Sequence, residues 1–157
     1  MRRARAVRLI AFAVGAFACV IVPACTPPQK DASFSIFWTD FRAAVTGRDL
    51  AKLTALARFP FEVRGPADAD PVWRYDREQF ASVANQLLNE SVRVYDGSKT
   101  VETPMAAVIT NRPSANDALI AEGQARIETF VFNKVGTTWL WTRAYSDEWE
   151  QLPKPAH

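Results

Sequence analysis

The side chains that could carry acid or base chemistry in this chain are few and scattered. The single histidine is His157, and because a residue in a terminal Pro-Lys-Pro segment is usually disordered, we expect no histidine acid or base. Asp40 could act as a carboxylate base, and Tyr75 and Tyr95 could donate hydrogen bonds to an oxyanion. Their spacing places no two of these three together, so the sequence favours structural roles over catalysis.

Aromatic and arginine side chains concentrate between residues 124 and 145. Residues 138–145 are expected to form a strand, one face of which carries Trp139, Trp141, Arg143 and Tyr145. On the preceding strand, Phe130 and Phe132 would point one way and Ile127 and Val131 the other. Both faces of this hairpin would then be substantially apolar, and we expect the second face to be covered.

Three arrangements would cover such a sheet. Its interior could enclose a small apolar ligand, with Arg126 or Arg143 as the polar anchor; its outer face could form a homodimer; or its interior could be filled by the protein's own side chains. The candidate ligand-binding residues are Trp38, Tyr75, Arg126, Trp141 and Arg143.

Three acidic residues near one loop, Asp68, Asp70 and Asp76, invite a search for a metal site. A hard cation such as Ca²⁺ needs six or more oxygen ligands, usually from a tightly spaced loop with a glycine bend, and this segment lacks that pattern. We expect a polar loop, with no metal and no cofactor.

The N-terminal segment has the layout of a bacterial export signal. Residues 1–8 include four arginines, residues 9–22 are almost entirely apolar, and a small-residue site follows. The sequence Val-Pro-Ala-Cys at 22–25 resembles a lipobox, so residues 1–24 are expected to be removed and Cys25 to be lipidated, followed by a polar tether over residues 25–33. The protein would then stand on the periplasmic face of a membrane; ordinary cleavage after Ala24 or Ala18 would instead secrete it to the periplasm, and an uncleaved anchor is the third alternative.

Removal of the signal changes the charge balance. The basic count falls from 19 to 15 while the acidic count stays at 17, so the mature chain carries a net charge of −2. Without a basic stripe for phosphate contacts, we expect no nucleic-acid partner. About 130 residues remain, enough for one domain, and because Cys19 and Cys25 lie in or beside the signal, no disulfide is expected.

Hydrophobic periodicity predicts the elements of this domain, residues 34–148. A helix begins near Ser33 and stops at Gly47, with its apolar residues spaced along one face. Further helices are expected after Asp49 and Asp76. Expected strands cover residues 61–64, 92–95, 105–110, 124–134 and 138–145, and residues 149–157 are expected to be a C-terminal tail.

Two helices, a short strand, a third helix and then antiparallel strands indicate an α+β fold. This order resembles the NTF2-like superfamily, on the segments FSIFWTDFRAAVTGRDLAKLTAL, FPFEVRG, DREQFASVANQLL and ETFVFNKVGTTWLWTRAY. The resemblance covers residues 33–146 and implies a cone in which N-terminal helices pack on a curved antiparallel sheet. It also implies a range of functions, because the superfamily includes isomerases, dehydratases and members that only bind or scaffold.

The sequence therefore favours a cell-envelope lipoprotein whose non-enzymatic domain binds a small apolar ligand or a protein partner. The alternative is a small isomerase or dehydratase that uses Asp and Tyr side chains inside the cone. The expected contacts are the membrane, through the lipid anchor, and a second copy of the chain, through the sheet.

Overall fold

The structure, a computed structural model, describes residues 31–115 and 117–155. The predicted signal peptide, Cys25 and His157 lie outside the described residues. The elements, in chain order, are α1 (Ala32–Thr46), α2 (Leu50–Ala55), β1 (Ala57–Arg64), β2 (Val72–Tyr75), α3 (Arg77–Asn89), β3 (Ser91–Tyr95), β4 (Thr100–Pro104), α4 (Met105–Asn111), β5 (Leu119–Ala121), β6 (Gln124–Ile127), β7 (Phe130–Val135), β8 (Thr138–Tyr145) and the 3₁₀ turn η1 (Trp149–Gln151).

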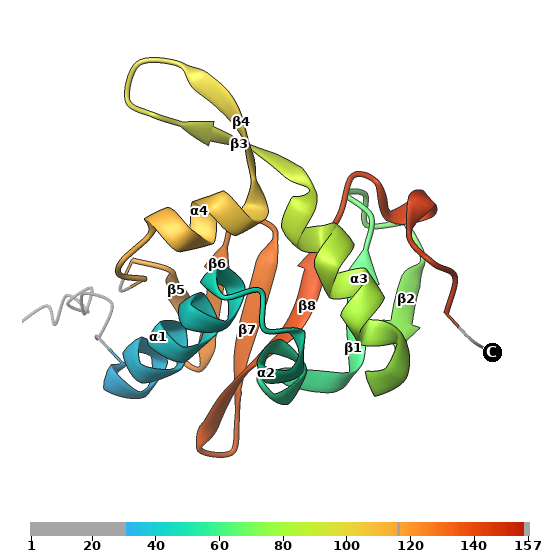
Figure 1. The fold of residues 1–157 in the computed structure, drawn as a ribbon, viewed down its shortest axis with the longest axis horizontal. Coiled ribbons are helices and arrows are strands. Elements are labelled where there is room, and N and C mark those ends of the chain that lie inside the picture. The colour runs from blue at the N-terminus through green and yellow to red at the C-terminus, as the bar shows by residue number, and fades with distance from the viewer. Residues whose placement is uncertain (1–30, 116, 156–157) are drawn as a thin grey trace, which may run out of the picture.

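A curved six-stranded sheet forms the centre of the molecule, with strand order β2-β1-β8-β7-β6-β5. Its neighbours pair antiparallel except β1 and β8, which pair in parallel, so the sheet is mixed and the expected purely antiparallel sheet is wrong. Figure 1 shows helices α1 to α4 gathered on one face of this sheet. We call that face the inner face and the opposite one the outer face. The α+β class predicted from the sequence is confirmed.

Helix α1 forms as its apolar spacing predicts. Asp31 caps its first turn, accepting a 2.9 Å hydrogen bond from the backbone N–H of Ser33, and Gly47 follows its last residue. Its buried stripe consists of Phe34, Phe37, Trp38, Phe41, Ala44 and Val45. This stripe packs on the inner face of the sheet and supplies much of the core.

The two following helices also begin at predicted caps. The Asp49 carboxylate accepts a hydrogen bond from the N–H of Lys52 at the start of α2, and the Asp76 carboxylate accepts one from the N–H of Gln79 at the start of α3, both at 2.9 Å. Each cap supplies an acceptor for a backbone donor that the helix itself leaves without one.

Several predicted strands were placed wrongly. Residues 105–110 belong to helix α4, whose buried residues Met105 and Ile109 lie one turn apart. Burial of this helix face outweighs the strand preference of the β-branched residues in the segment. Residues 124–134 are two strands, β6 and β7, separated by a turn in which Glu128 adopts a φ of 48°.

The first strands differ from the prediction as well. Strand β1 begins at Ala57 and not at Phe61, and it runs through a cis Phe59-Pro60 peptide bond. Proline has no N–H to give to the ladder, and the register of β1 with β8 shifts between Ala57 and Glu62. Three short strands, β2, β4 and β5, were not predicted.

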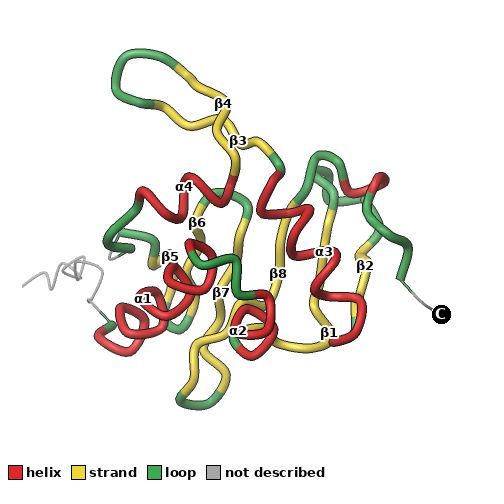
Figure 2. Tube along the Cα trace, viewed as in Figure 1, coloured by secondary structure: helices red, strands yellow, loops and turns green. Residues whose placement is uncertain are grey.

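Strands β3 and β4 form a separate hairpin that extends away from the main body (Figures 1 and 2). Its root is closed by a 2.9 Å hydrogen bond from the N–H of Met105 to the carbonyl oxygen of Glu90. Tyr95, near the tip of the hairpin, is 68% exposed.

The segment after β8 packs against the domain. The Trp149 ring contacts the Trp73 ring with centroids 5.1 Å apart, and Leu152 is buried. The packed domain therefore extends at least to Leu152, four residues beyond the predicted boundary. Over residues 31–115 and 117–155, no helix has the length and apolar character needed to cross a membrane.

Candidate functional site

The structure divides the five predicted ligand-binding residues between the two faces of the sheet. Trp38, Tyr75 and Trp141 lie on the inner side and are fully buried or nearly so. Arg126 and Arg143 lie on the outer face, where Arg143 pairs in register with Glu62. A ligand held between the aromatic rings on the inner side of the sheet would therefore not meet either arginine.

A β-bulge at Thr142 causes this division. Val131 is paired with Arg143, but the next residue, Phe132, is paired with Trp141, so Thr142 is one extra residue in β8. The alternation of side chains reverses at this point. Trp139 and Trp141 share the inner face, as predicted, whereas Arg143 and Tyr145 lie on the outer face, and the prediction that all four share a face is wrong.

The turn between β6 and β7 likewise changes which residues share a face. Ile127 is paired with Phe130, so both point inward. Ile127 and Val131 were predicted to share a face, but Val131 points outward. The outer face is consequently polar over much of its area, and the predicted pair of apolar faces does not exist.

Aromatic rings fill the inner side of the sheet. The Trp141 ring lies 4.4 to 5.5 Å, centroid to centroid, from the rings of Phe41, Phe61, Phe80 and Phe130. The indole N–H of Trp38 donates a 3.1 Å hydrogen bond to the carbonyl oxygen of Arg112. Rings at these separations are in direct contact, so the protein's own aromatic side chains pack closely around Trp141 on this side of the sheet.

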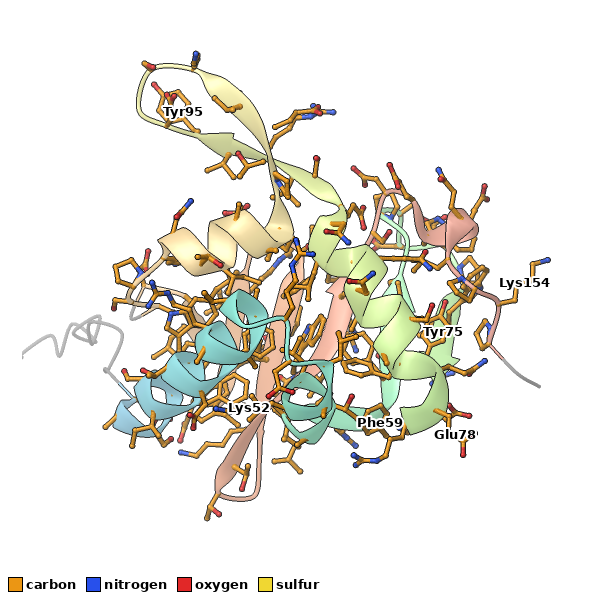
Figure 3. All side chains as sticks on the ribbon, in the orientation of Figure 1. Lys52, Phe59, Tyr75, Glu78, Tyr95 and Lys154 are labelled. Carbon is orange, nitrogen blue, oxygen red and sulfur yellow. The ribbon has the colours of Figure 1, made fainter. Side chains whose placement is uncertain are left out.

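The residues considered for acid–base chemistry lie in separate places. Tyr75 is buried on β2 while Tyr95 is at the far end of the β3–β4 hairpin (Figure 3). The Asp40 carboxylate is exposed and lies 3.5 Å from the ammonium group of Lys52. These three side chains do not form one site.

Tyr75 has an unusual environment of its own. Its hydroxyl group is buried and has no hydrogen-bond partner among residues 31–115 and 117–155, and burial raises the pKa of the phenol to about 12. The hydroxyl therefore stays protonated at neutral pH.

The acidic loop also has structural roles. The Asp70 carboxylate accepts a 2.8 Å hydrogen bond from the N–H of Ala67, and Asp76 caps α3. Over the part of the chain that the structure describes, no group of three or more His, Cys, Asp or Glu side chains is placed to hold a metal ion.

The outer face carries the most distinctive cluster of charged side chains. Cross-strand pairing aligns one residue from each of five adjacent strands, and we call this set the arginine row: Arg74, Glu62, Arg143, Val131 and Arg126. Neighbouring strands lie about 4.8 Å apart, so the row is about 19 Å long.

Glu62 is the only carboxylate in the arginine row, and three guanidinium groups surround it. Its Oε2 accepts hydrogen bonds from Arg143 Nη2 at 2.6 Å and Nε at 3.0 Å, while Arg74 lies 3.4 Å from its Oε1 and Arg64 3.7 Å from its Oε2. Partial burial favours the neutral acid, but the hydrogen bond from Arg143 and the positive charges outweigh burial and lower the pKa of Glu62. Glu62 is therefore ionised at neutral pH.

Arg126, at the end of the row, has a different set of contacts. Its Nε donates a 2.8 Å hydrogen bond to the carbonyl oxygen of Glu128, and its guanidinium lies 5.0 Å from the centre of the Tyr145 ring. Between Arg126 and Arg143, Val131 is only 4% exposed. Long arginine stems commonly cover apolar side chains in this way while their charged heads stay in water.

Polar side chains continue the outer face beside the row. Gln124 donates to Asn133 at 3.1 Å, and Asn133 donates to the Thr142 hydroxyl at 2.6 Å. The Thr142 hydroxyl in turn donates to the carbonyl oxygen of Val131 at 3.3 Å. This chain of hydrogen bonds satisfies the polar atoms at the bulge.

Arg126 and Arg143 were predicted as site residues from the sequence, whereas Glu62, Arg64 and Arg74 were not. The signal for these three residues was present, because charged residues alternate with apolar ones in Phe61-Glu62-Val63-Arg64 and in Trp73-Arg74-Tyr75. Such alternation is typical of a strand with one solvated face.

The chain was also compared with known proteins. No family model matches it, and no match was found among the curated proteins or the solved structures.

Proposed function

We propose that this chain is an exported, lipid-anchored envelope protein whose NTF2-like domain binds a protein partner through the outer face of its sheet and catalyses no reaction. The observation that carries the proposal is the contrast between the two faces. Helices and packed aromatic rings cover the inner face, whereas the outer face bears the charged, partly exposed arginine row.

The NTF2-like assignment is supported by the helices gathered on one face of a curved α+β sheet. A protein partner is favoured over a small apolar ligand because the rings around Trp141 are in contact with one another. The isomerase or dehydratase alternative is not favoured, since Asp40, Tyr75 and Tyr95 lie apart.

Site-specific photo-crosslinking in the bacterial envelope tests this proposal. A photoreactive phenylalanine analogue would replace Leu140 or Tyr145, which are half-buried on the outer face, and Asn85, which is exposed on α3, as the control. We expect one discrete adduct from both outer-face positions and none from Asn85. The absence of adducts from both outer-face positions, or the same adduct from Asn85, would contradict the proposal.

A further inference from the structure

We propose that the arginine row binds an acidic segment of the partner protein, whose carboxylates pair with Arg74, Arg143 and Arg126. This inference rests on the proposed function, because it names the chemistry of the partner at the same face of the sheet.

Positive charge on this face exceeds negative charge. Arg64, Arg74 and Arg143 share the single carboxylate of Glu62, and Arg126 contacts a carbonyl oxygen and an aromatic ring. The side chain of Arg74 is 57% exposed, and those of Arg64 and Arg143 are 37% and 30% exposed. Guanidinium donors therefore remain accessible to further carboxylates.

Two of the three guanidinium groups are held in place before any partner binds. Arg143 is held by two hydrogen bonds to Glu62, and Arg126 is held between the Glu128 carbonyl oxygen and the Tyr145 ring. A fixed guanidinium fork matches the two oxygens of a carboxylate, and fixing it in advance reduces the entropy lost on binding.

The spacing of the row suits a peptide. Arg74, Arg143 and Arg126 lie on β2, β8 and β6, which are alternate strands of the sheet, so their Cα atoms are about 9.6 Å apart. Three residues of extended chain cover about 10 Å. Side chains three residues apart share a face in the polyproline II conformation, which has three residues per turn and rises about 3.1 Å per residue. A segment in that conformation lying across the strands can therefore place an Asp or Glu at every third position against successive arginines.

Two other occupants fit the charges less well. A second copy that docked by the same face would bring the two arginine rows together, and like charges across an interface are unfavourable. An anionic bilayer attracts clusters of basic side chains through their summed charge, but the mature chain has a net charge of −2, and fixed arginine pairs are not needed for such attraction.

Fluorescence anisotropy with a labelled peptide of ten glutamates tests the inference. The native protein, purified in neutral detergent, is compared with Arg74→Glu and Arg126→Glu and with the control Arg93→Glu, which makes the same change in charge at an exposed position of β3. Each row variant should weaken binding about tenfold or more, as expected for the loss of charge-assisted hydrogen bonds. The control should change it less than about twofold. If a glutamate variant misfolds, as judged by circular dichroism, Arg74→Gln and Arg126→Gln keep the stem and should still weaken binding.

Each of the other outcomes would overturn the inference. These are no binding by the native protein, equal weakening by Arg93→Glu, or displacement of the peptide when anionic phosphatidylglycerol is mixed into the detergent micelles, which would indicate a bilayer. Crosslinks from Leu140 and Tyr145 that persist without peptide binding would leave the proposed function standing and remove only the acidic character of the partner.

Discussion

Asp31 joins the first helix to the last hairpin. Besides capping α1, its carboxylate lies 3.2 Å from the ammonium group of Lys134 and accepts a 3.3 Å hydrogen bond from the indole N–H of Trp139. The hydrogen bond from the Ser33 hydroxyl is the largest of the effects that lower the pKa of Asp31 from 3.8 to about 2. The ionised carboxylate therefore stabilises the folded state.

Replacing Asp31 by alanine should lower the free energy of unfolding by about 1 to 2 kcal/mol at neutral pH, the usual cost of a lost cap. A lowered pKa gives stability that is complete above the unfolded value and is lost as pH falls through the folded value. The difference in the free energy of unfolding between the native protein and Asp31→Ala should thus become smaller as the pH falls from 3.8 to about 2. Denaturant titration at several pH values measures it. Asp40→Ala, which removes an exposed ion pair, should cost less than about 0.5 kcal/mol.

Trp38 tests the packing of α1. Its ring is 1% exposed and lies 6.0 to 6.2 Å, centroid to centroid, from the rings of Phe41 and Phe132. Trp38→Ala should destabilise the fold by about 3 to 5 kcal/mol, because it empties a large buried site. Ile36→Ala on the exposed side of the same helix should cost less than about 0.5 kcal/mol. Equal effects in thermal or denaturant unfolding would contradict the assigned helix face.

At the scale of elements, the sequence predicts best what is decided locally. The start of α1 follows from apolar spacing and those of α2 and α3 from single Asp caps, and all three helices are where these signals place them. Helix α4 was predicted as a strand because its β-branched residues carry the opposite local signal. Its conformation is decided by packing, which includes a 2.9 Å hydrogen bond from the Arg42 side chain to the carbonyl oxygen of Thr110.

The candidate site was predictable only in part for a related reason. The alternation of side chains along a strand assigns them to the correct faces only up to a bulge, where one extra residue is inserted. Nothing in the sequence Trp141-Thr142-Arg143 itself indicates the bulge. Its position depends on β7, through the change in pairing from Arg143 with Val131 to Trp141 with Phe132. The sequence could therefore identify Arg143 as a candidate but not the face on which it lies.

Thr142 tests the bulge. Its hydroxyl group is buried and links Asn133 to the carbonyl oxygen of Val131. Thr142→Val keeps the shape but leaves the Asn133 amide and the Val131 carbonyl without this partner, so it should cost about 1 to 3 kcal/mol. Thr142→Ser keeps the hydroxyl group and should cost less. Denaturant unfolding compares the two variants, and a valine variant as stable as the serine variant would show that these hydrogen bonds do not hold the bulge.

At the scale of the whole molecule, the arginine row opposes self-association through the outer face of the sheet. The homodimer expected from the sequence rested on an apolar outer face, and pairing two copies through the observed face would oppose their arginines. We expect residues 26–157 to sediment as a monomer at low ionic strength. Trp139 and Trp141, at 2% and 0% exposure, should resist a soluble quencher in that monomer. A dimer at low salt that dissociates on Arg126→Glu would contradict this expectation.

The proposed attachment to the membrane depends on a different part of the chain. No described helix is suited to span a bilayer, whereas a lipidated Cys25 would supply about 0.8 kcal/mol for each buried CH₂ group. Cys25→Ser should therefore move the processed protein from the detergent-extracted fraction to the aqueous one, with loss of the lipid mass in mass spectrometry. Cys19→Ser, inside the predicted signal, removes a thiol without removing the lipidation site and should leave the protein with the membrane. If processed Cys25→Ser protein still required detergent for extraction, the anchor would have to lie elsewhere in the chain.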